Sequence, residues 1–335
     1  MTSRSRRHFL QGGLGLAGIG LLSGCDAPWL PWPTTRVPRI GLLALGPREA
    51  RARINAELLQ GLRDLGYGEG QNVAIEYRFA DSSDRLADLA AELVALPVDL
   101  IVATGGSPAA VAAKEATATI PIVFIAVGDP VGTGLASSLA HPGGNLTGLS
   151  NLAAALPGKM VELLHTTIPA LSRLAVIAND THPVHPTMEK ETAAAVRGLG
   201  IQMQALRIRS AGDYGDAFRA AAGARADAVY LFADSVGTNA RDQLAELGLR
   251  YQLATAFDFR ENVAAGGLLS YGPSLVDMYR RAATYVDKIL RGAKPADLPI
   301  EQPTTFDLII NAKTAHALGL TIPQSVLQQA TEVIQ

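Results

Sequence analysis

The sequence is poor in cysteine and in aromatic residues. Cys25 is the one cysteine among 335 residues, so the chain forms no internal disulfide and offers no cysteine-based metal site. Both tryptophans, Trp29 and Trp32, lie near the N-terminus, and aromatic residues make up only 5% of the chain. Abundant alanine and glycine with so few aromatics favour helices packed on parallel sheets over an all-β sandwich.

The sequence also lacks an excess of either charge. It has 29 basic and 31 acidic residues, which gives a formal net charge of −2. No basic patch stands out, so nucleic-acid binding has no electrostatic support. At 335 residues the chain is nevertheless long enough for two lobes, each with its own buried core.

No apolar run reaches the roughly 20 residues that a membrane-spanning helix needs. The longest candidate, residues 9–22, contains five glycines. Residues 13–18 match the dinucleotide pattern G-x-G-x-x-G, but arginines precede them and prolines follow. The strand and helix of a nucleotide site are therefore missing. A charged start, a short apolar centre and small residues at the end predict an export signal over residues 1–24.

Two short motifs refine this export signal. The letters SRRHFL resemble the twin-arginine signature, and LSGC at residues 22–25 resembles a lipobox, in which the cysteine is acylated. An acylated Cys25 would tether the protein to a membrane surface at the periplasm or cell surface. Asp26 resembles the signal that retains such lipoproteins at the inner membrane. Residues 25–38 then form a proline-rich linker. The alternative is ordinary secretory cleavage, in which Cys25 keeps an unmodified thiol.

From Arg39 onward, short apolar runs alternate with amphipathic helical patterns, as in βαβ units. The predicted strands are Ile40–Leu45, Val73–Phe79, Leu100–Thr104, Ile122–Ala126, Leu174–Ala178, Met203–Ile208, Ala228–Phe232 and Leu268–Tyr271. The predicted helices are Ala50–Leu65, Asp84–Leu96, Pro108–Ala116, Leu156–Thr167, His185–Leu199, Tyr214–Ala222, Ala240–Leu247 and Leu275–Leu290.

A faint internal repeat predicts two similar lobes. Residues 63–106 and 197–234 show the same order of features. Each begins at the end of a helix with a Leu-Gly stop, continues with a strand and a helix, and ends with an apolar strand that follows an aspartate and leads into a polar loop. Between the two copies, residues 120–152 begin as a strand and continue as a glycine- and proline-rich passage. A long irregular segment inside a compact chain is usually functional or a connection, so we expect the first crossover between the lobes here.

Three segments carry a family resemblance. They are GLRDLGYGEGQNVAIEYR, TIPIVFIAVGDPVGTGLASSLAHPGGNLTGLS, and the stretch from YGPSLVDMYRRAATYVDKIL to the C-terminus. With these segments the chain resembles bacterial ABC-transporter substrate-binding proteins of the family that includes tryptophan- and tyrosine-type binders. The resemblance covers most of residues 39–335.

The resemblance implies a fold and a function. The fold is α/β, a two-lobed type I periplasmic-binding fold with three crossing strands and a ligand cleft between the lobes. We assign residues 39–150 plus about 265–295 to lobe I, and residues 151–264 plus about 296–335 to lobe II. The implied function is an extracytoplasmic solute-binding lipoprotein that works as a monomer, binds a small ligand by cleft closure and delivers it to an ABC permease.

Candidate ligand contacts in lobe I follow the ends of predicted strands, where open α/β sheets bind ligands. The loop with Thr104, Gly106 and Ser107 ends one strand and opens a helix, so its hydroxyls and free N–H groups suit a carboxylate. The alternative is a plain strand–helix turn with Ser107 as the N-cap. Asp129 suits a ligand ammonium, although Asp before Pro is also an ordinary turn former.

Candidate contacts in lobe II follow the same rule. Asn179, Asp180 and Asp234 end strands, and the alternative for each is a helix cap. Phe257 and Tyr271 are candidate stacking surfaces, or ordinary packing. A carboxylate and an ammonium together favour an amino acid, and an aromatic or branched side chain is compatible. Another small carboxylate and a sugar are the alternatives, although the folded part has no tryptophan to stack on a sugar.

Other functions have less support. His182 and His185 are three residues apart but lie in a proline-rich loop without a third ligand nearby, so we predict no metal site and no cofactor. No Gly-x-Ser-x-Gly elbow or other nucleophile motif appears, and we predict no enzyme activity. A cytosolic regulator would carry a helix-turn-helix where this chain has an export signal. A sensory lipoprotein that signals to a receptor remains an alternative to transport.

Overall fold

The structure is a computed structural model that describes residues 36–335, and Val37–Gln335 form one unit within it. The predicted signal peptide, Cys25 and nearly all of the predicted linker lie outside the described residues. None of the helices within residues 36–335 has both the length and the apolar character needed to cross a bilayer.

The first sheet has five parallel strands in the order β2-β1-β3-β4-β5. They are β1 (Arg39–Leu45), β2 (Ala74–Ala80), β3 (Leu100–Ala103), β4 (Ile122–Val127) and β5 (Leu146–Ser150). Every residue of β3 and β5 is buried. Burial on both faces explains why β3 reads as the continuous apolar run LIVA rather than as an alternating pattern.

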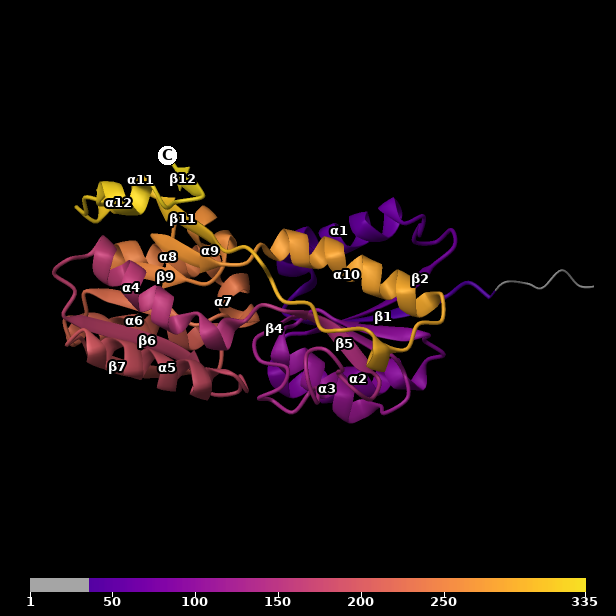
Figure 1. Cartoon of the computed structure of the whole chain (residues 1–335). Helices are drawn as coiled ribbons and strands as arrows, with labels where there is room; N and C mark the ends of the chain where they lie inside the picture. Colours follow the sequence, from indigo (N-terminus) through magenta and orange to yellow (C-terminus); the bar gives the residue numbers. More distant parts are fainter. Residues whose placement is uncertain (1–35) are drawn as a thin grey trace, which may run out of the picture. The chain divides into compact units, whose positions relative to one another are not determined.

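Helices cover both faces of this sheet (Figure 1). One face carries α1 (Arg48–Asp64) and α10 (Leu275–Leu290), and the other carries α2 (Leu86–Ala95) and α3 (Ser107–Ala116). Alternate side chains of β1 serve the two faces: Leu42 joins the core under α1, whereas Leu43 joins the core under α2. α1 and α10 approach closely at Gly61, where an added Cβ would lie 2.6 Å from the backbone oxygen of Arg280.

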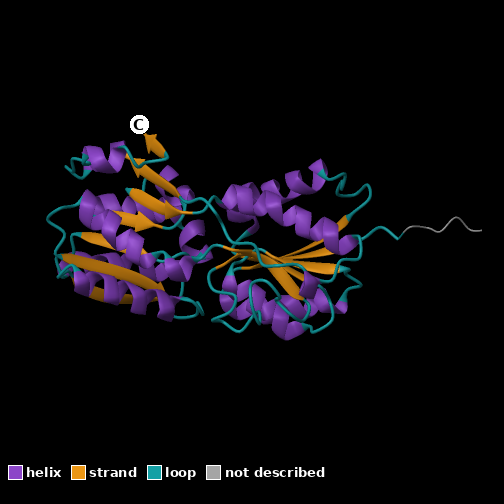
Figure 2. Cartoon of the chain, viewed as in Figure 1, coloured by secondary structure: helices purple, strands orange, loops and turns teal. Residues whose placement is uncertain are grey.

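The second sheet has seven strands in the order β12-β11-β10-β9-β8-β6-β7. They are β6 (Arg173–Asn179), β7 (Gln202–Ile208), β8 (Ala228–Leu231), β9 (Ala254–Phe257), β10 (Leu269–Gly272), β11 (Asp307–Asn311) and β12 (Glu332–Ile334). All neighbouring pairs are parallel except β10 and β11. Figure 2 shows this sheet and the first one as separate orange layers.

Helices also cover both faces of the second sheet. They are α4 (Pro157–Thr167), α5 (His185–Gly198), α6 (Tyr214–Gly223), α7 (Ser235–Asn239), α8 (Arg241–Arg250), α9 (Arg260–Ala264), α11 (Ala312–Ala317) and α12 (Gln324–Leu327). Val176 of β6 packs in the core with residues of α4 and α5. Its neighbour Ile177 packs with residues of α6 and α8. The sheet is therefore buried on both sides, like the first.

The predicted internal repeat is confirmed. In the first copy, β2 is followed by a 3-10 turn (Ser83–Arg85), α2 and β3; in the second, β7 is followed by a 3-10 turn (Ala211–Asp213), α6 and β8. The two copies occupy equivalent places, because β2 and β3 flank β1 as β7 and β8 flank β6. Each lobe is built on one copy.

The chain passes between the two sheets after β5, after β10 and before β11. The prediction of a crossover over residues 120–152 is wrong for most of that passage, because residues 146–150 return to the first sheet as β5 and only the end of the passage crosses. Residues 265–295 contain both β10, which belongs to the second sheet, and α10, which packs on α1. The residue limits of the two lobes stay a prediction.

Candidate functional site

A pocket lies where the carboxyl ends of strands from both sheets face each other. Segments that follow β3, β4 and β5 line it from lobe I, and segments that follow β6, β8 and β9 line it from lobe II. The lining residues are Arg51, Thr104, Gly106, Ala126, Gly128, Asn151, Ala153, His182, Ala233, Asp234, Ser235, Thr238, Phe259, Leu275 and Tyr279. We call this the inner pocket. Its volume of about 30 Å³ is close to the share of one water molecule in the liquid.

In lobe I, the loop after β3 brings Thr104 and Gly106 to the inner pocket. Gly106 has a φ of 68°, a left-handed conformation that favours glycine, and it precedes the first turn of α3. Ser107 is fully buried, and its hydroxyl accepts a hydrogen bond from the N–H of Gly128 at 3.3 Å. Ser107 therefore ties the loop after β4 to the start of α3 and does not line the pocket.

In lobe II, Asp234 is the acidic side chain of the inner pocket and is 6% exposed. Its carboxylate accepts hydrogen bonds from the Asn179 side-chain amide at 2.7 Å and from the N–H of Val236 at 3.0 Å. The second bond caps α7, so Asp234 is a helix cap and a pocket residue at once. Asn179 positions Asp234 from behind, because its own side-chain oxygen is occupied by Thr181.

His182 and His185 stack on each other beside Asp234, with ring centroids 4.1 Å apart. His185 bonds to the N–H of Asn179 and to the carbonyl of Ala233. Burial, and after it the neighbouring His185, holds the pKa of His182 well below its usual 6.5. Burial also lowers the pKa of His185, although Asp234 acts in the opposite direction. At neutral pH the pair is uncharged, so it leaves Asp234 and Arg51 as the ionic groups of the pocket.

Arg51 is the basic residue of the inner pocket, and its side chain comes from α1. It is only 4% exposed. Its Nη2 donates to the backbone oxygen of Thr104 and to the hydroxyl of Tyr279 on α10, while that hydroxyl donates to the same oxygen at 2.8 Å. Burial raises the pKa of Tyr279, and the guanidinium of Arg51 acts in the opposite direction. The pattern analysis of the sequence missed both residues.

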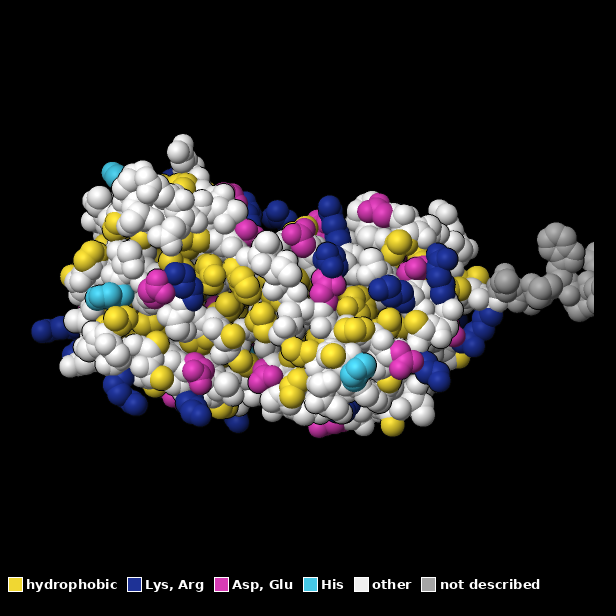
Figure 3. All heavy atoms as spheres, in the orientation of Figure 1, with side chains coloured by type: hydrophobic (Ala, Val, Ile, Leu, Met, Phe, Trp, Pro, Cys, Tyr) yellow, Lys and Arg dark blue, Asp and Glu magenta, His cyan; other side chains and the backbone are white. Residues whose placement is uncertain are grey.

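A larger cavity of about 580 Å³ adjoins the inner pocket, and Arg51, Thr238 and Leu275 line both. We call it the outer cavity. It lies between α1 and the start of α10 on one side and α7, α8, α9 and β11 on the other. Figure 3 shows basic and acidic side chains gathered along the upper edge of the molecule, where the surface is hollowed. The charged lining residues are Arg51, Arg53, Glu57, Arg241, Asp242, Arg260, Glu261 and Asp307.

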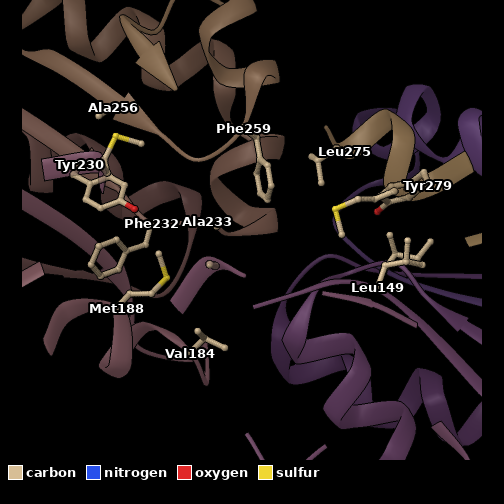
Figure 4. Close-up of a cluster of buried hydrophobic side chains, with 14 of the residues drawn as sticks. Leu149, Val184, Met188, Tyr230, Phe232, Ala233, Ala256, Phe259, Leu275 and Tyr279 are labelled. Carbon is tan, nitrogen blue, oxygen red and sulfur yellow. The ribbon is translucent and has the colours of Figure 1, made fainter. Parts of the chain in front are cut away.

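Apolar side chains complete the inner pocket. Figure 4 shows Phe259 of lobe II and Leu275 of α10 on opposite sides of the gap between the lobes. Both are largely buried and belong to the core cluster that extends into both lobes. Two further contacts join the lobes at the rim: Thr181 and Ser83 have their hydroxyl oxygens 3.3 Å apart, and the amide of Asn239 donates to the carbonyl of Leu45 at 3.3 Å.

The other candidate residues from the sequence lie away from the inner pocket. Asp129 accepts a hydrogen bond from the N–H of Gly132 at 2.8 Å, which closes a turn. Asp180 pairs with Arg207, with an N–O distance of 3.7 Å. Phe257 is buried in the core of lobe II.

Tyr271 stacks on Phe306 with ring centroids 5.7 Å apart. Neither ring lines the inner pocket or the outer cavity. Among residues 36–335, no three His, Cys, Asp or Glu side chains gather as they would around a metal ion.

Comparison with known sequences decides the family. A profile of the ABC transporter substrate-binding protein family matches residues 40–334. The chain belongs to this family. A tyrosine-binding protein of Clostridioides difficile is 24% identical over 315 residues, which cover 91% of this chain and 90% of that protein.

Solved structures agree with this assignment. A conserved domain protein of Vibrio cholerae has a TM-score of 0.83 at 28% identity and covers 89% of this chain and 100% of its own. An ABC domain in complex with L-Trp from Streptococcus pneumoniae has a TM-score of 0.81 at 27% identity and covers 89% and 99%. Solute-binding proteins at 14–16% identity share the fold alone. The fold is the predicted two-lobed type I periplasmic-binding fold, and the chain is a substrate-binding protein of an ABC transporter.

Proposed function

We propose that this substrate-binding protein captures an amino acid between its lobes outside the cytoplasm and delivers it to an importing permease. The observation that carries the proposal is the composition of the inner pocket. Lobe I supplies Thr104, Gly106 and Asn151 as polar contacts, and lobe II supplies the carboxylate of Asp234. A relative named as tyrosine-binding and a neighbour solved with L-Trp support an amino acid as the ligand class.

The site works by closure. The inner pocket is too small for an amino acid, so the lobes must separate for a ligand to enter and the ligand must extend into the outer cavity. The three segments that cross between the sheets absorb this motion, as hinges do in other two-lobed binding proteins. Because both lobes contribute lining residues, a bound ligand favours the closed state over the open one.

Isothermal titration calorimetry with the twenty L-amino acids, small carboxylates and hexoses tests this proposal. We expect saturable binding of at least one amino acid and none of the hexoses. Asp234→Asn should weaken amino-acid binding by about tenfold or more, because the ammonium loses its anionic partner. Asp129→Asn is the matched control, since this carboxylate closes a turn outside the pocket. Failure of every amino acid to bind would refute the proposed function.

We also propose that the protein is anchored by a lipid on Cys25. The support comes from the lipobox-like letters before this residue and from the proline-rich linker after it. In a bacterial host, the protein should sediment with membranes, and Cys25→Ala should release it into the soluble fraction. Unchanged retention of the variant would exclude the anchor, while a test of ligand binding on the released protein would remain independent of it.

A further inference from the structure

Among the residues that the structure describes, Arg51 is a buried cation without an anionic partner. Its guanidinium has two neutral acceptors, the backbone oxygen of Thr104 and the hydroxyl of Tyr279, and both are reached through Nη2. Its Nε is buried and has no hydrogen-bond partner. Within residues 36–335, no carboxylate oxygen lies within 4.0 Å of the guanidinium nitrogens. An arginine cannot lose its proton to relieve this burial.

The acidic residues near Arg51 are paired with other groups or lie on the opposite lobe. Glu57, one helical turn and a half along α1, pairs with Arg280 at 2.7 Å. Asp234 is engaged by Asn179 and the start of α7. Glu261 lines the outer cavity from lobe II, and burial raises the pKa of its carboxyl although Arg260 acts in the opposite direction. Lobe I itself therefore supplies no counter-charge to Arg51.

We propose that Arg51 binds the carboxylate of the ligand. A buried guanidinium is costly without an anion, and its planar fork matches a carboxylate with two parallel hydrogen bonds. Arg51 lines both the inner pocket and the outer cavity, so the carboxylate binds where the two join. Tyr279 and the Thr104 carbonyl fix the orientation of the guanidinium. The inference rests on the proposed function and restricts the ligand to a carboxylate, which excludes neutral sugars.

With Asp234 on the other lobe, this assignment places the two ends of a zwitterion on opposite sides of the cleft. Arg51 of lobe I takes the carboxylate, and Asp234 of lobe II takes the ammonium. The head group of one amino acid then bridges the lobes, and neither lobe alone satisfies it. Ligand binding and closure are thereby linked through charge as well as through shape.

The test compares each of the twenty L-amino acids with its C-terminal amide in calorimetry, using the wild-type protein, Arg51→Gln and Arg63→Gln. For the wild type, we expect the amide to bind at least about 30-fold more weakly than the parent acid, which corresponds to the cost of about 2 kcal/mol or more for losing one partner of a buried charge pair. Arg51→Gln should weaken binding of the acid by a similar factor. Arg63→Gln removes the same charge from an exposed position on α1 that lines neither the inner pocket nor the outer cavity, and it should change affinity less than about threefold.

The possible outcomes separate the two proposals. If acid and amide bind within threefold of each other, Arg51 does not bind the carboxylate, although the proposed function stands. If Arg51→Gln binds as tightly as the wild type, the assignment is equally wrong. If no amino acid and no other carboxylate binds, both proposals fail. The comparison of acid with amide needs no variant, so it decides the matter even if Arg51→Gln does not fold; Tyr279→Phe, which keeps the charge, should cost less than about tenfold.

Discussion

Asp258 is an ionisable residue buried directly behind the inner pocket. It is 2% exposed and lies next to the pocket residue Phe259. Its carboxylate accepts hydrogen bonds from the hydroxyl of Tyr230 and the N–H of Ala233, at 2.7 and 2.8 Å. Burial raises the pKa of Asp258 to about 7, although these two hydrogen bonds act in the opposite direction. Replacing it with asparagine keeps the shape and removes the charge.

The sign of the effect follows from linkage. An acid whose pKa is higher in the folded than in the unfolded protein contributes stability below its unfolded pKa of 3.8, and this stability is lost as pH rises through the folded pKa of about 7. At about 1.36 kcal/mol per pKa unit, the total is about 4 kcal/mol, and about 2–3 kcal/mol of it falls between about pH 5 and pH 8. Asp258→Asn lacks this loss. Its stability relative to the wild type should therefore rise by that amount over this interval.

Urea unfolding followed by circular dichroism at pH 5, 6.5 and 8 measures this difference. In the variant, the amide oxygen accepts from Ala233 and the amide nitrogen donates to Tyr230, and any fixed cost of that exchange leaves the pH dependence unchanged. Asp227→Asn is a control without a slope: although burial raises its pKa, hydrogen bonds from the N–H groups of Ser172 and Arg173 leave the pKa of Asp227 below its usual 3.8, so the stability of this variant relative to the wild type should stay constant between about pH 5 and pH 8. Parallel pH profiles for Asp258→Asn and the wild type would refute the reasoning.

Three further perturbations have defined outcomes. Burial lowers the pKa values of His182 and His185, so stability should fall as pH drops below their usual 6.5, and thermal melting should show a smaller fall in His182→Gln. Gly272→Ala would place a Cβ 1.9 Å from the backbone oxygen of Asp258 and should destabilise the protein by about 1–3 kcal/mol in urea unfolding. Asn239→Ala removes a hydrogen bond across the rim and should weaken ligand affinity by up to about tenfold, with a larger radius of gyration in X-ray scattering.

Local patterns predicted the strands of the repeated βαβ units and missed four strands outside the repeat. The strands of the repeat carry apolar runs such as LIVA and AVYL, which indicate burial on both faces. The strands that were missed are β5 (LTGLS), β9 (ATAF), β11 (DLIIN) and β12 (EVI). β5 and β9 are built mainly from small and polar residues. Their strand conformation depends on pairing with β4 and β8, respectively. Residues 128–145 separate β4 from β5, and two helices, α7 and α8, separate β8 from β9. A pattern read within one segment does not contain that information.

The limits of patterns within single segments also explain why some of the candidate site residues line the inner pocket and others do not. Thr104, Gly106 and Asp234 were proposed because they follow strands, and in the structure all three line the inner pocket, where the carboxyl ends of parallel strands lie. Asp129 follows a strand as well, but its carboxylate turns back to the N–H of Gly132. Proximity to a strand end therefore identifies the loops of a site. The direction of each side chain depends on contacts within the loop.

Arg51 has a signal of a different kind in the sequence. It lies on the buried stripe of α1 with Asn55, Leu58 and Leu62, at a spacing of four, seven and eleven residues. A charged residue on the face that a helix buries needs a partner. In the part of the chain that the structure describes, the hydrogen-bond partners of Arg51 are a tyrosine 228 residues away and a backbone carbonyl, both neutral. A cation that the fold buries without an anion is explained most simply by an anion that arrives with the ligand, which is the result that the comparison of amino acids with their amides will support or refute.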